Sequence, residues 1–313
     1  MTRRLSITLL ILSIVITAIN AQEGDTGYQF LQVPTSAHSA ALGGCNVSII
    51  EDDPSLVFNN PALLANVSDK TLNLNFTSYI SSTSKLSAAF VKQAGGRGTW
   101  AVAAMLLNYG KMTETNENFE ELGEFSAKDI SVQGGYTYLL SDRWSGGVQG
   151  KVIMSNYGEF KSTALGVDLG INYYDADHGL SFSLVGQNLG GQAKALYEKN
   201  EKLPFNLVAG ISKDLANAPI RLSLTFDNIT DWDEKKPINH LTFGADIFPS
   251  STTWVGVGYN PRRGNEMKIG DSKHWAGLSL GAGLTLKKLK VGLAWGKYHV
   301  AASSLVINTS YAL

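Results

Sequence analysis

From Thr71 to the carboxy terminus, apolar and polar residues alternate along runs of about nine to eleven residues. A period of two predicts β-strands with one apolar face, and this run length is what a tilted strand needs to cross the hydrocarbon layer of a membrane. The clearest run contains Leu165, Val167, Leu169, Ile171 and Tyr173. We therefore expect membrane-spanning strands that present their apolar face to lipid.

The runs predict fourteen strands, an even number as in bacterial single-chain barrels. Their expected positions are 71–79, 85–93, 99–108, 127–139, 144–155, 164–174, 179–188, 204–213, 220–229, 239–248, 252–260, 275–285, 289–298 and 304–313. The predicted fold is all-β, a transmembrane antiparallel β-barrel of about 14 strands with a short N-terminal helical plug or cap. A soluble β-sandwich is the alternative, but its strands average about five or six residues, which is shorter than these runs.

Connections between the predicted strands alternate between short and long, except that the first and last long-side loops are also short. The short set is 94–98, 140–143, 175–178, 214–219, 249–251 and 286–288, and the long set is 109–126, 189–203, 230–238 and 261–275. Outer-membrane barrels have tight periplasmic turns and longer external loops, so both barrel ends should lie on the periplasmic side. Aromatic residues near the strand ends should form girdles at the membrane surfaces. They are Trp100, Trp144, Trp254, Trp275, Trp295, Tyr173 and Tyr298.

The other face of each strand should line the lumen. Polar and charged residues expected there are Gln149, Lys151, Asp168, Asn172, Arg221, Asp227 and Asp246. Opposite charges in a shared lumen can pair and so stabilise the barrel. Other inward positions are small, as in Gly277, Ser279, Gly281 and Gly283. Such a lumen has space that another part of the chain can fill.

Residues 1–21 resemble a cleaved signal peptide. Arg3 and Arg4 precede an apolar run from Leu5 to Ile19, and the small residue Ala21 follows where a signal peptidase would cut. A membrane anchor is the alternative, but the run is shorter than the roughly 20 apolar residues that a spanning helix needs. The chain has one cysteine, Cys45, which allows no intramolecular disulfide and is expected to be a small packing residue.

Residues 22–70 form the plug or cap, and residues 71–313 the barrel. Ser36 to Leu42 predicts a short helix that Gly43 and Gly44 end, and Asn60 predicts the cap of a second helix at 61–66. Four apolar residues would be exposed if this segment hung free, namely Val57, Phe58, Leu63 and Leu64. Folding into the lumen would bury them, although a cap over the periplasmic mouth remains equally possible.

The composition and the residue spacing indicate neither a catalytic or metal site nor a nucleic-acid-binding surface. The formal charge is -1 and Lys and Arg are scattered, which leaves no basic stripe. Five histidines share no spacing, and Asp52 with Asp53 fits a turn or a helix cap better than a metal site. Ser303 and Ser304 near His299 could suggest a hydrolase, but no supporting acid is identifiable. We expect no catalytic residue, no cofactor and no metal.

The segment before the barrel resembles a known family. The residues that carry the resemblance are Tyr28, Gln29, Phe30, Leu31, Pro34, Thr35, Ser36, Ala37, Ala41, Leu42, Gly43, Gly44, Asp52, Asp53, Asn59, Asn60, Pro61, Ala62 and Leu63. Their order and spacing resemble the start of the PorQ family, outer-membrane components of the type IX secretion system of Bacteroidetes. The barrel that follows is similar to the wider fatty-acid-transporter-like superfamily, which also contains the PorV proteins.

The resemblance implies an integral outer-membrane protein of a Gram-negative, Bacteroidetes-like bacterium, in contact with outer-membrane lipid. It also implies that the barrel anchors a PorZ-like surface protein of the complex that attaches exported cargo to the cell surface. We place the partner contact on the long loops, with Glu117, Glu120, Glu121, Arg262, Arg263 and Lys268 as candidates. The alternative is a transporter of hydrophobic ligands, but loops rich in Glu, Lys, Asn and Gly favour the anchor.

Overall fold

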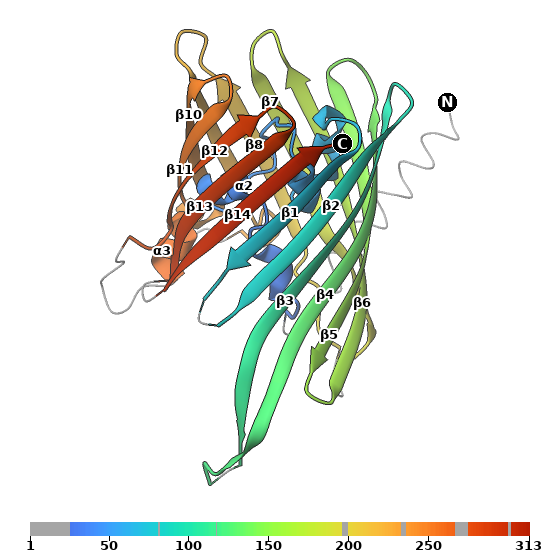
Figure 1. Ribbon diagram of the computed structural model, residues 1–313, viewed down its shortest axis with the longest axis vertical. Helices are drawn as coiled ribbons and strands as arrows, with labels where there is room; N and C mark the ends of the chain where they lie inside the picture. The colour runs from blue at the N-terminus through green and yellow to red at the C-terminus, as the bar shows by residue number, and fades with distance from the viewer. Residues whose placement is uncertain are drawn as a thin grey trace.

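The computed structural model describes residues 26–80, 82–116, 118–195, 200–232, 236–266, 275–299 and 302–313. In this part of the chain fourteen antiparallel strands pair each with the next, and the first pairs with the last, which closes a barrel (Figure 1). The strands are β1 (Thr71–Ser78), β2 (Ser84–Ala94), β3 (Gly98–Thr115), β4 (Glu121–Leu139), β5 (Trp144–Tyr157), β6 (Phe160–Asp175), β7 (Leu180–Lys194), β8 (Asn206–Asp214), β9 (Ile220–Phe226), β10 (Leu241–Ser250), β11 (Thr253–Tyr259), β12 (Leu278–Leu286), β13 (Leu289–His299) and β14 (Ala302–Ala312). The predicted fold class is confirmed.

Alternation along the strands separates two environments. The run that predicts β6 most clearly, Leu165 to Ile171, places its apolar side chains outside with exposed fractions between 37% and 53%. The residues between them point inward, as Asp168 does with none of its surface exposed. An apolar exterior on a closed sheet is the solution that lets a β-structure span lipid. None of the described helices is both long and apolar enough to cross a membrane.

The two ends of the barrel differ, as the connection lengths predict. One end carries tight turns, the first residue of β1 and the last residues of β14, and the carboxy terminus lies there (Figure 1). We call it the short-turn end, and the opposite one the long-loop end. Two expected loops are partly strand, because β3 continues to Thr115, β4 begins at Glu121 and β7 continues to Lys194. The expected loop 261–275 contains the short helix α3 (Pro261–Glu266), and η4 (Pro237–His240) precedes β10.

The expected aromatic girdle is partly wrong. Trp100, Trp144 and Trp275 are exposed on the outside or at the rim. Trp254 instead stacks on a histidine of the plug, and Tyr298 is buried inside the barrel. Both aromatics lie next to outward positions in their strands, so the alternation turns them inward.

Residues 26–70 lie inside the barrel and cross it from one end to the other, and we call them the plug. Gly27 donates to the Lys202 carbonyl near the long-loop end, and Thr71 begins β1 at the short-turn end. The plug contains η1 (Gln29–Gln32), α2 (Ala37–Ala41), η2 (Pro54–Phe58) and η3 (Pro61–Asn66), drawn in blue in Figure 1. The expected second helix is thus a 3₁₀ helix, and η2 is an element that the pattern did not predict. The expected signal peptide lies outside the described residues.

Candidate functional site

The helix α2 and the turn after it pack against the wall of the barrel. Ser36 caps α2 by accepting a hydrogen bond from the Ser39 amide, and Gly43 and Gly44 end the helix with φ angles of 99° and 90°. Such positive φ angles suit glycine because it has no Cβ. The small side chains Ala37 and Ala41 let the helix lie directly against β12 to β14. The sequence motif therefore corresponds to a close helix-to-wall contact.

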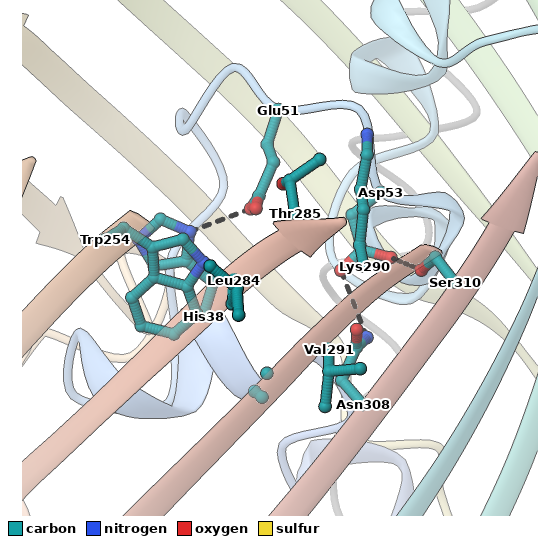
Figure 2. Close-up of a pocket in the computed structure, with 12 residues that line it drawn as sticks. His38, Glu51, Asp53, Trp254, Leu284, Thr285, Lys290, Val291, Asn308 and Ser310 are labelled. Carbon is teal, nitrogen blue, oxygen red and sulfur yellow. Dashed lines mark hydrogen bonds and ion pairs between the residues drawn. The ribbon is translucent and has the colours of Figure 1, made fainter. Parts of the chain in front are cut away.

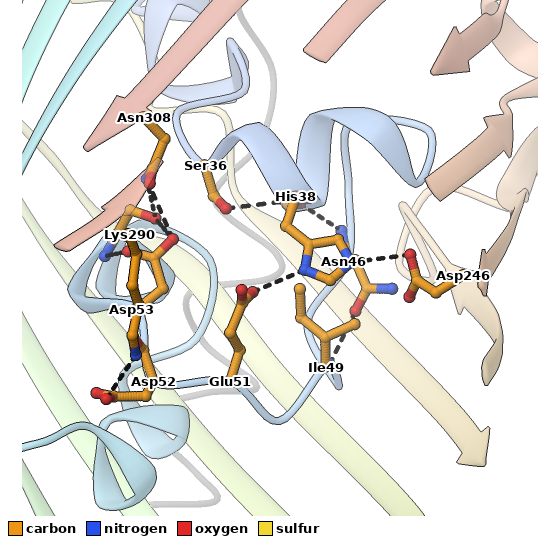
Figure 3. A network of polar contacts seen from close by, with 12 residues as sticks. Ser36, His38, Asn46, Ile49, Glu51, Asp52, Asp53, Asp246, Lys290 and Asn308 are labelled. Carbon is orange, nitrogen blue, oxygen red and sulfur yellow. Dashed lines mark hydrogen bonds and ion pairs between the residues drawn. The ribbon is translucent and has the colours of Figure 1, made fainter. Parts of the chain in front are cut away.

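His38 projects from α2 into a charged cluster between the plug and the wall (Figures 2 and 3). Its Nδ1 lies 2.8 Å from Oε2 of Glu51, and its Nε2 lies 2.8 Å from Oδ1 of Asp246 on β10. Its ring stacks on Trp254 of β11, with 3.8 Å between ring centroids and 5° between planes. Both carboxylates accept hydrogen bonds, so the imidazole donates from both nitrogens and carries a positive charge.

The neighbouring charges determine the protonation of His38 and Glu51. Burial alone favours a neutral ring, but the negative charges of Glu51 and Asp246 outweigh it and raise the pKa of His38 to about 10. Burial would raise the pKa of the Glu51 carboxyl, but the charged His38 lowers it below its usual value. The plug is therefore joined to β10 by a buried ionic cluster that is charged at neutral pH.

Two neighbouring acids of the plug hold it to β1, β13 and β14. Asp53 caps η2 by accepting a hydrogen bond from the Ser55 amide, in agreement with the expected helix cap. Its carboxylate is surrounded by neutral donors (Figures 2 and 3). These donors are Ser55, Asn73, Asn308 and Ser310. Burial, and then the charge of Glu51, raises the pKa of Asp53. Asp52 instead pairs with Lys290 of β13 at 2.5 Å.

Elsewhere around the barrel, η3 contacts β4 and β5 through its backbone. Asn60 caps η3 by accepting from the Ala62 amide and donates to the Val47 carbonyl. Thr137 donates to the Pro61 carbonyl, and Ser145 donates to the Ala62 carbonyl at 2.9 Å. Hydroxyl groups of the wall thus satisfy carbonyls that the short helix leaves free.

Apolar packing adds a third kind of contact between the plug and the wall. Leu63, Leu64 and Val57 are fully buried, as expected for a segment that folds inside the barrel. A cluster at the long-loop end joins Tyr28 and Phe30 of the plug to apolar residues of the wall and of the β7–β8 connection, namely Met105, Leu107, Ile153, Ala164 and Leu203. The plug is consequently held by ionic, hydrogen-bonded and apolar contacts around the barrel.

Between the plug and α3, at the long-loop end, lies a cavity of about 360 Å³ that we call the vestibule. Leu31, Val33 and Phe58 give it an apolar side. Arg262 and Arg263 of α3 lie on another side. Its volume falls within the range of about 300–1,000 Å³ that is usual for small-molecule pockets.

Charges in the vestibule are not all compensated. Lys151 pairs with Asp168 at 2.7 Å, and Arg262 pairs with Glu266 at 2.8 Å. Arg263 stacks on the Tyr298 ring at 3.9 Å and donates to the Gly43 carbonyl at 3.3 Å. Within the described part of the chain no carboxylate lies at ion-pair distance from Arg263. This guanidinium can therefore receive an anionic group.

The structure separates the expected partner-facing residues. Glu120 and Glu121 are exposed where β3 turns into β4, and Arg262 is at the rim. Arg263 lies instead inside the vestibule against the plug. Glu117 and Lys268 lie outside the described residues.

Sequence reasoning missed several residues of these clusters. His38, Glu51 and Trp254 drew no functional expectation, since separations such as the 208 residues between His38 and Asp246 leave no local spacing. The position of Trp254, one residue out of phase with the outward Val255 and Val257, is a signal that could have placed it in the lumen. Among the described residues, no group of three His, Cys, Asp or Glu could hold a metal ion.

Comparison with known proteins identifies the fold. No family model matches the chain, and no curated protein matches it. The toluene transporter TbuX of Ralstonia pickettii superposes with a TM-score of 0.60 at 13% identity, over 91% of this chain and 100% of that one. A Pseudomonas aeruginosa FadL homologue gives 0.58 at 11% identity, over 93% and 100%, and the CymD monoaromatic hydrocarbon channel gives 0.58 at 14%, over 90% and 97%. The chain thus shares the barrel fold of these solved structures.

Proposed function

We propose that this protein is an outer-membrane barrel of a Gram-negative bacterium that takes up a hydrophobic or amphipathic small molecule, which binds first in the vestibule. The observation that carries the proposal is the cavity itself, which combines an apolar side with a guanidinium that has spare donors. The shared fold with a toluene transporter and a hydrocarbon channel supports it. In such a site the apolar side receives the ligand's hydrocarbon part, and Arg263 receives a polar end.

Cys45 offers a direct test because it lines the vestibule and is the single cysteine of the chain. Burial raises the pKa of its thiol, so its reaction with a methanethiosulfonate reagent should be slow and sensitive to what fills the cavity. Toluene and decanoate serve as probes, one neutral and one anionic. We expect at least one of them to slow the labelling of the barrel in lipid nanodiscs in a saturable manner.

Two variants make this test specific. Gln32 is exposed and lines the vestibule, so Gln32→Trp should reduce protection by filling part of the cavity. Thr113→Trp adds the same ring outside the cavity, on the exposed part of β3, and should leave protection unchanged. Labelling that neither probe slows, or equal protection in Gln32→Trp, would contradict ligand binding at this site.

A second candidate is the anchor that the family resemblance implies, a barrel that holds a PorZ-like surface protein of the type IX attachment complex. Two observations favour it: the plug fills much of the lumen, and β3 with β4 projects beyond the rest of the barrel (Figure 1). Affinity purification of the barrel from its native outer membranes tests it. Recovery of a stoichiometric surface protein supports the anchor, and recovery of the barrel alone opposes it.

A further inference from the structure

The outer parts of β3 and β4 form a two-stranded ribbon that has left the barrel wall. β2 pairs with β3 only as far as Asn108, and β5 pairs with β4 only from Ala127. Beyond these points β3 and β4 pair with each other from Lys111 to Thr115 and from Glu121 to Ser126. We call residues 110–116 and 118–126 the ribbon, and Figure 1 shows it extending past every other strand.

A bulge marks the place where the ribbon leaves the wall. Tyr109 and Gly110 stand opposite the single residue Ala127, between the pairs that Asn108 and Lys111 make. Gly110 has a φ of 84°, which favours glycine, and lies beside Ser82. Such a bulge bends a strand and increases its local twist, so the direction of the ribbon is built into the chain.

The ribbon exposes unpaired strand edges and apolar side chains. Within the described residues, no strand pairs with its two outer edges. A single backbone hydrogen bond reaches the base of the β4 edge, where the Gly158 amide donates to the Ser126 carbonyl. Its tip residue Phe119 is 89% exposed, and Leu122 is 63% exposed. A two-stranded ribbon is marginally stable alone, and free edges with apolar side chains are templates for another chain.

Charge identifies the kind of occupant. The described residues of the ribbon carry one Lys and four Glu, a net formal charge of -3 in a chain whose total is -1. A second copy of the ribbon would repel it, and so would anionic lipid headgroups. A segment with Lys or Arg next to apolar residues complements it.

We propose that the ribbon is a docking arm for an extended, basic segment of a partner protein, which adds as a strand to one of its free edges. This site is separate from the vestibule and does not depend on ligand uptake. The docking arm rests on the anchor function and assigns the partner contact to a specific surface, the ribbon.

Photo-crosslinking in the native cell tests the proposal. A photoreactive amino acid replaces Leu122 on the ribbon, and in a control it replaces Ile238, which is exposed on η4 outside the ribbon. We expect one protein to crosslink from position 122 and not from 238, through a peptide that contains Lys or Arg. Lipopolysaccharide, a second copy of the barrel or no product would each overturn the proposal.

A pair of matched double variants tests the role of charge. Glu114→Gln with Glu121→Gln removes two ribbon charges, and Glu159→Gln with Asp231→Asn removes two exposed charges from other loops of the same end. The ribbon variant should lower the crosslinking yield roughly three- to tenfold and the control should not, because each exposed ion pair contributes modestly. An equal yield in both variants would contradict the charge argument.

A stable partner that binds independently of the ribbon would support the anchor function and refute the docking arm. Cys45 protection should be the same in the ribbon variant as in the wild type, so ligand binding is judged separately.

Discussion

At the scale of single residues, His38 shows how a buried charge joins the plug to the barrel. Its imidazolium lies between the carboxylates of Glu51 and Asp246, on the face of Trp254. Removing one member of a buried ionic cluster leaves the others uncompensated, which costs about 3–5 kcal/mol. Docking of the plug should therefore depend on this side chain and on its protonation.

The pH dependence of stability follows from the pKa of His38. That pKa is raised to about 10 in the folded protein, from about 6.5 when unfolded. The stabilisation is therefore complete below about pH 6.5 and is lost as the pH rises through about 10. We expect His38→Gln to lower the urea unfolding midpoint in detergent micelles at neutral pH and to differ less from the wild type above pH 10.

His178 gives the matched control for that experiment. It lies on the turn after β6 and is largely exposed, so His178→Gln should leave the unfolding midpoint nearly unchanged at every pH. A difference between His38→Gln and the wild type that persists undiminished above pH 10 would show that packing on Trp254, rather than charge, stabilises the plug.

A pair of glycines in β5 tests how closely the plug packs on the wall. A Cβ at Gly147 would lie 2.5 Å from the Pro61 carbonyl carbon and the Ala62 nitrogen, whereas a Cβ at Gly150 meets nothing within 4 Å. We expect Gly147→Ala to destabilise the protein by about 1–3 kcal/mol, since overpacking displaces η3. Gly150→Ala should change the free energy of unfolding by less than about 0.5 kcal/mol. Equal effects in urea titrations would contradict a rigidly docked η3.

At the scale of elements, η3 is a short 3₁₀ helix whose position depends on its cap. Asn60 accepts from the Ala62 amide and donates to the buried Val47 carbonyl, so it orders two segments of the plug. Asn60→Ala should cost about 1–2 kcal/mol and speed hydrogen exchange at the Ala62 amide. Asn66 is exposed at the other end of η3, and Asn66→Ala should change neither quantity. Unchanged exchange in Asn60→Ala would refute the capping role.

Elements with one face in lipid were predictable from the alternation of apolar and polar residues, and elements without such a face were predictable only where capping residues marked them. Period-two alternation located all fourteen strands because each presents an apolar row to the membrane. The ribbon lacked a regular apolar row, because both of its faces are exposed and Glu residues interrupt the alternation. The helices η2 and α3 are five and six residues long, too short for a helical period to appear. Capping residues were more informative, as Ser36 and Asn60 show.

Contacts between distant segments could not be predicted in the same way. The small, polar inward residues indicated that the lumen has space, and the exposed apolar residues of the plug indicated that it needs cover. Which plug residue meets which strand depends on the closed register of the sheet, for example where Lys290 meets Asp52. A single sequence contains no local signal for such pairs.

At the scale of the whole molecule, the plug and the wall form one closed unit with two different ends. The long-loop end presents the vestibule and the ribbon, and the short-turn end presents tight turns and the carboxy terminus. Polar clusters hold the plug to β1, β10, β13 and β14, and apolar clusters hold it to β2 and β3. A molecule bound in the vestibule would therefore contact residues of the plug on its lumen side.

Deletion of residues 27–66 tests whether the plug is what closes the lumen. The wall beneath it is rich in small and polar side chains, as at Gly147, Ser279 and Gly281, so its removal should leave a water-filled pore. We expect ionic conductance in planar bilayers to rise well above that of the intact protein. Heat-dependent migration in gels shows whether the shortened barrel still folds, and Gly150→Ala serves as a folded control with a normal plug. A folded deletion variant that does not conduct would mean that wall side chains collapse into the space, and that the plug orders the lumen rather than obstructing it.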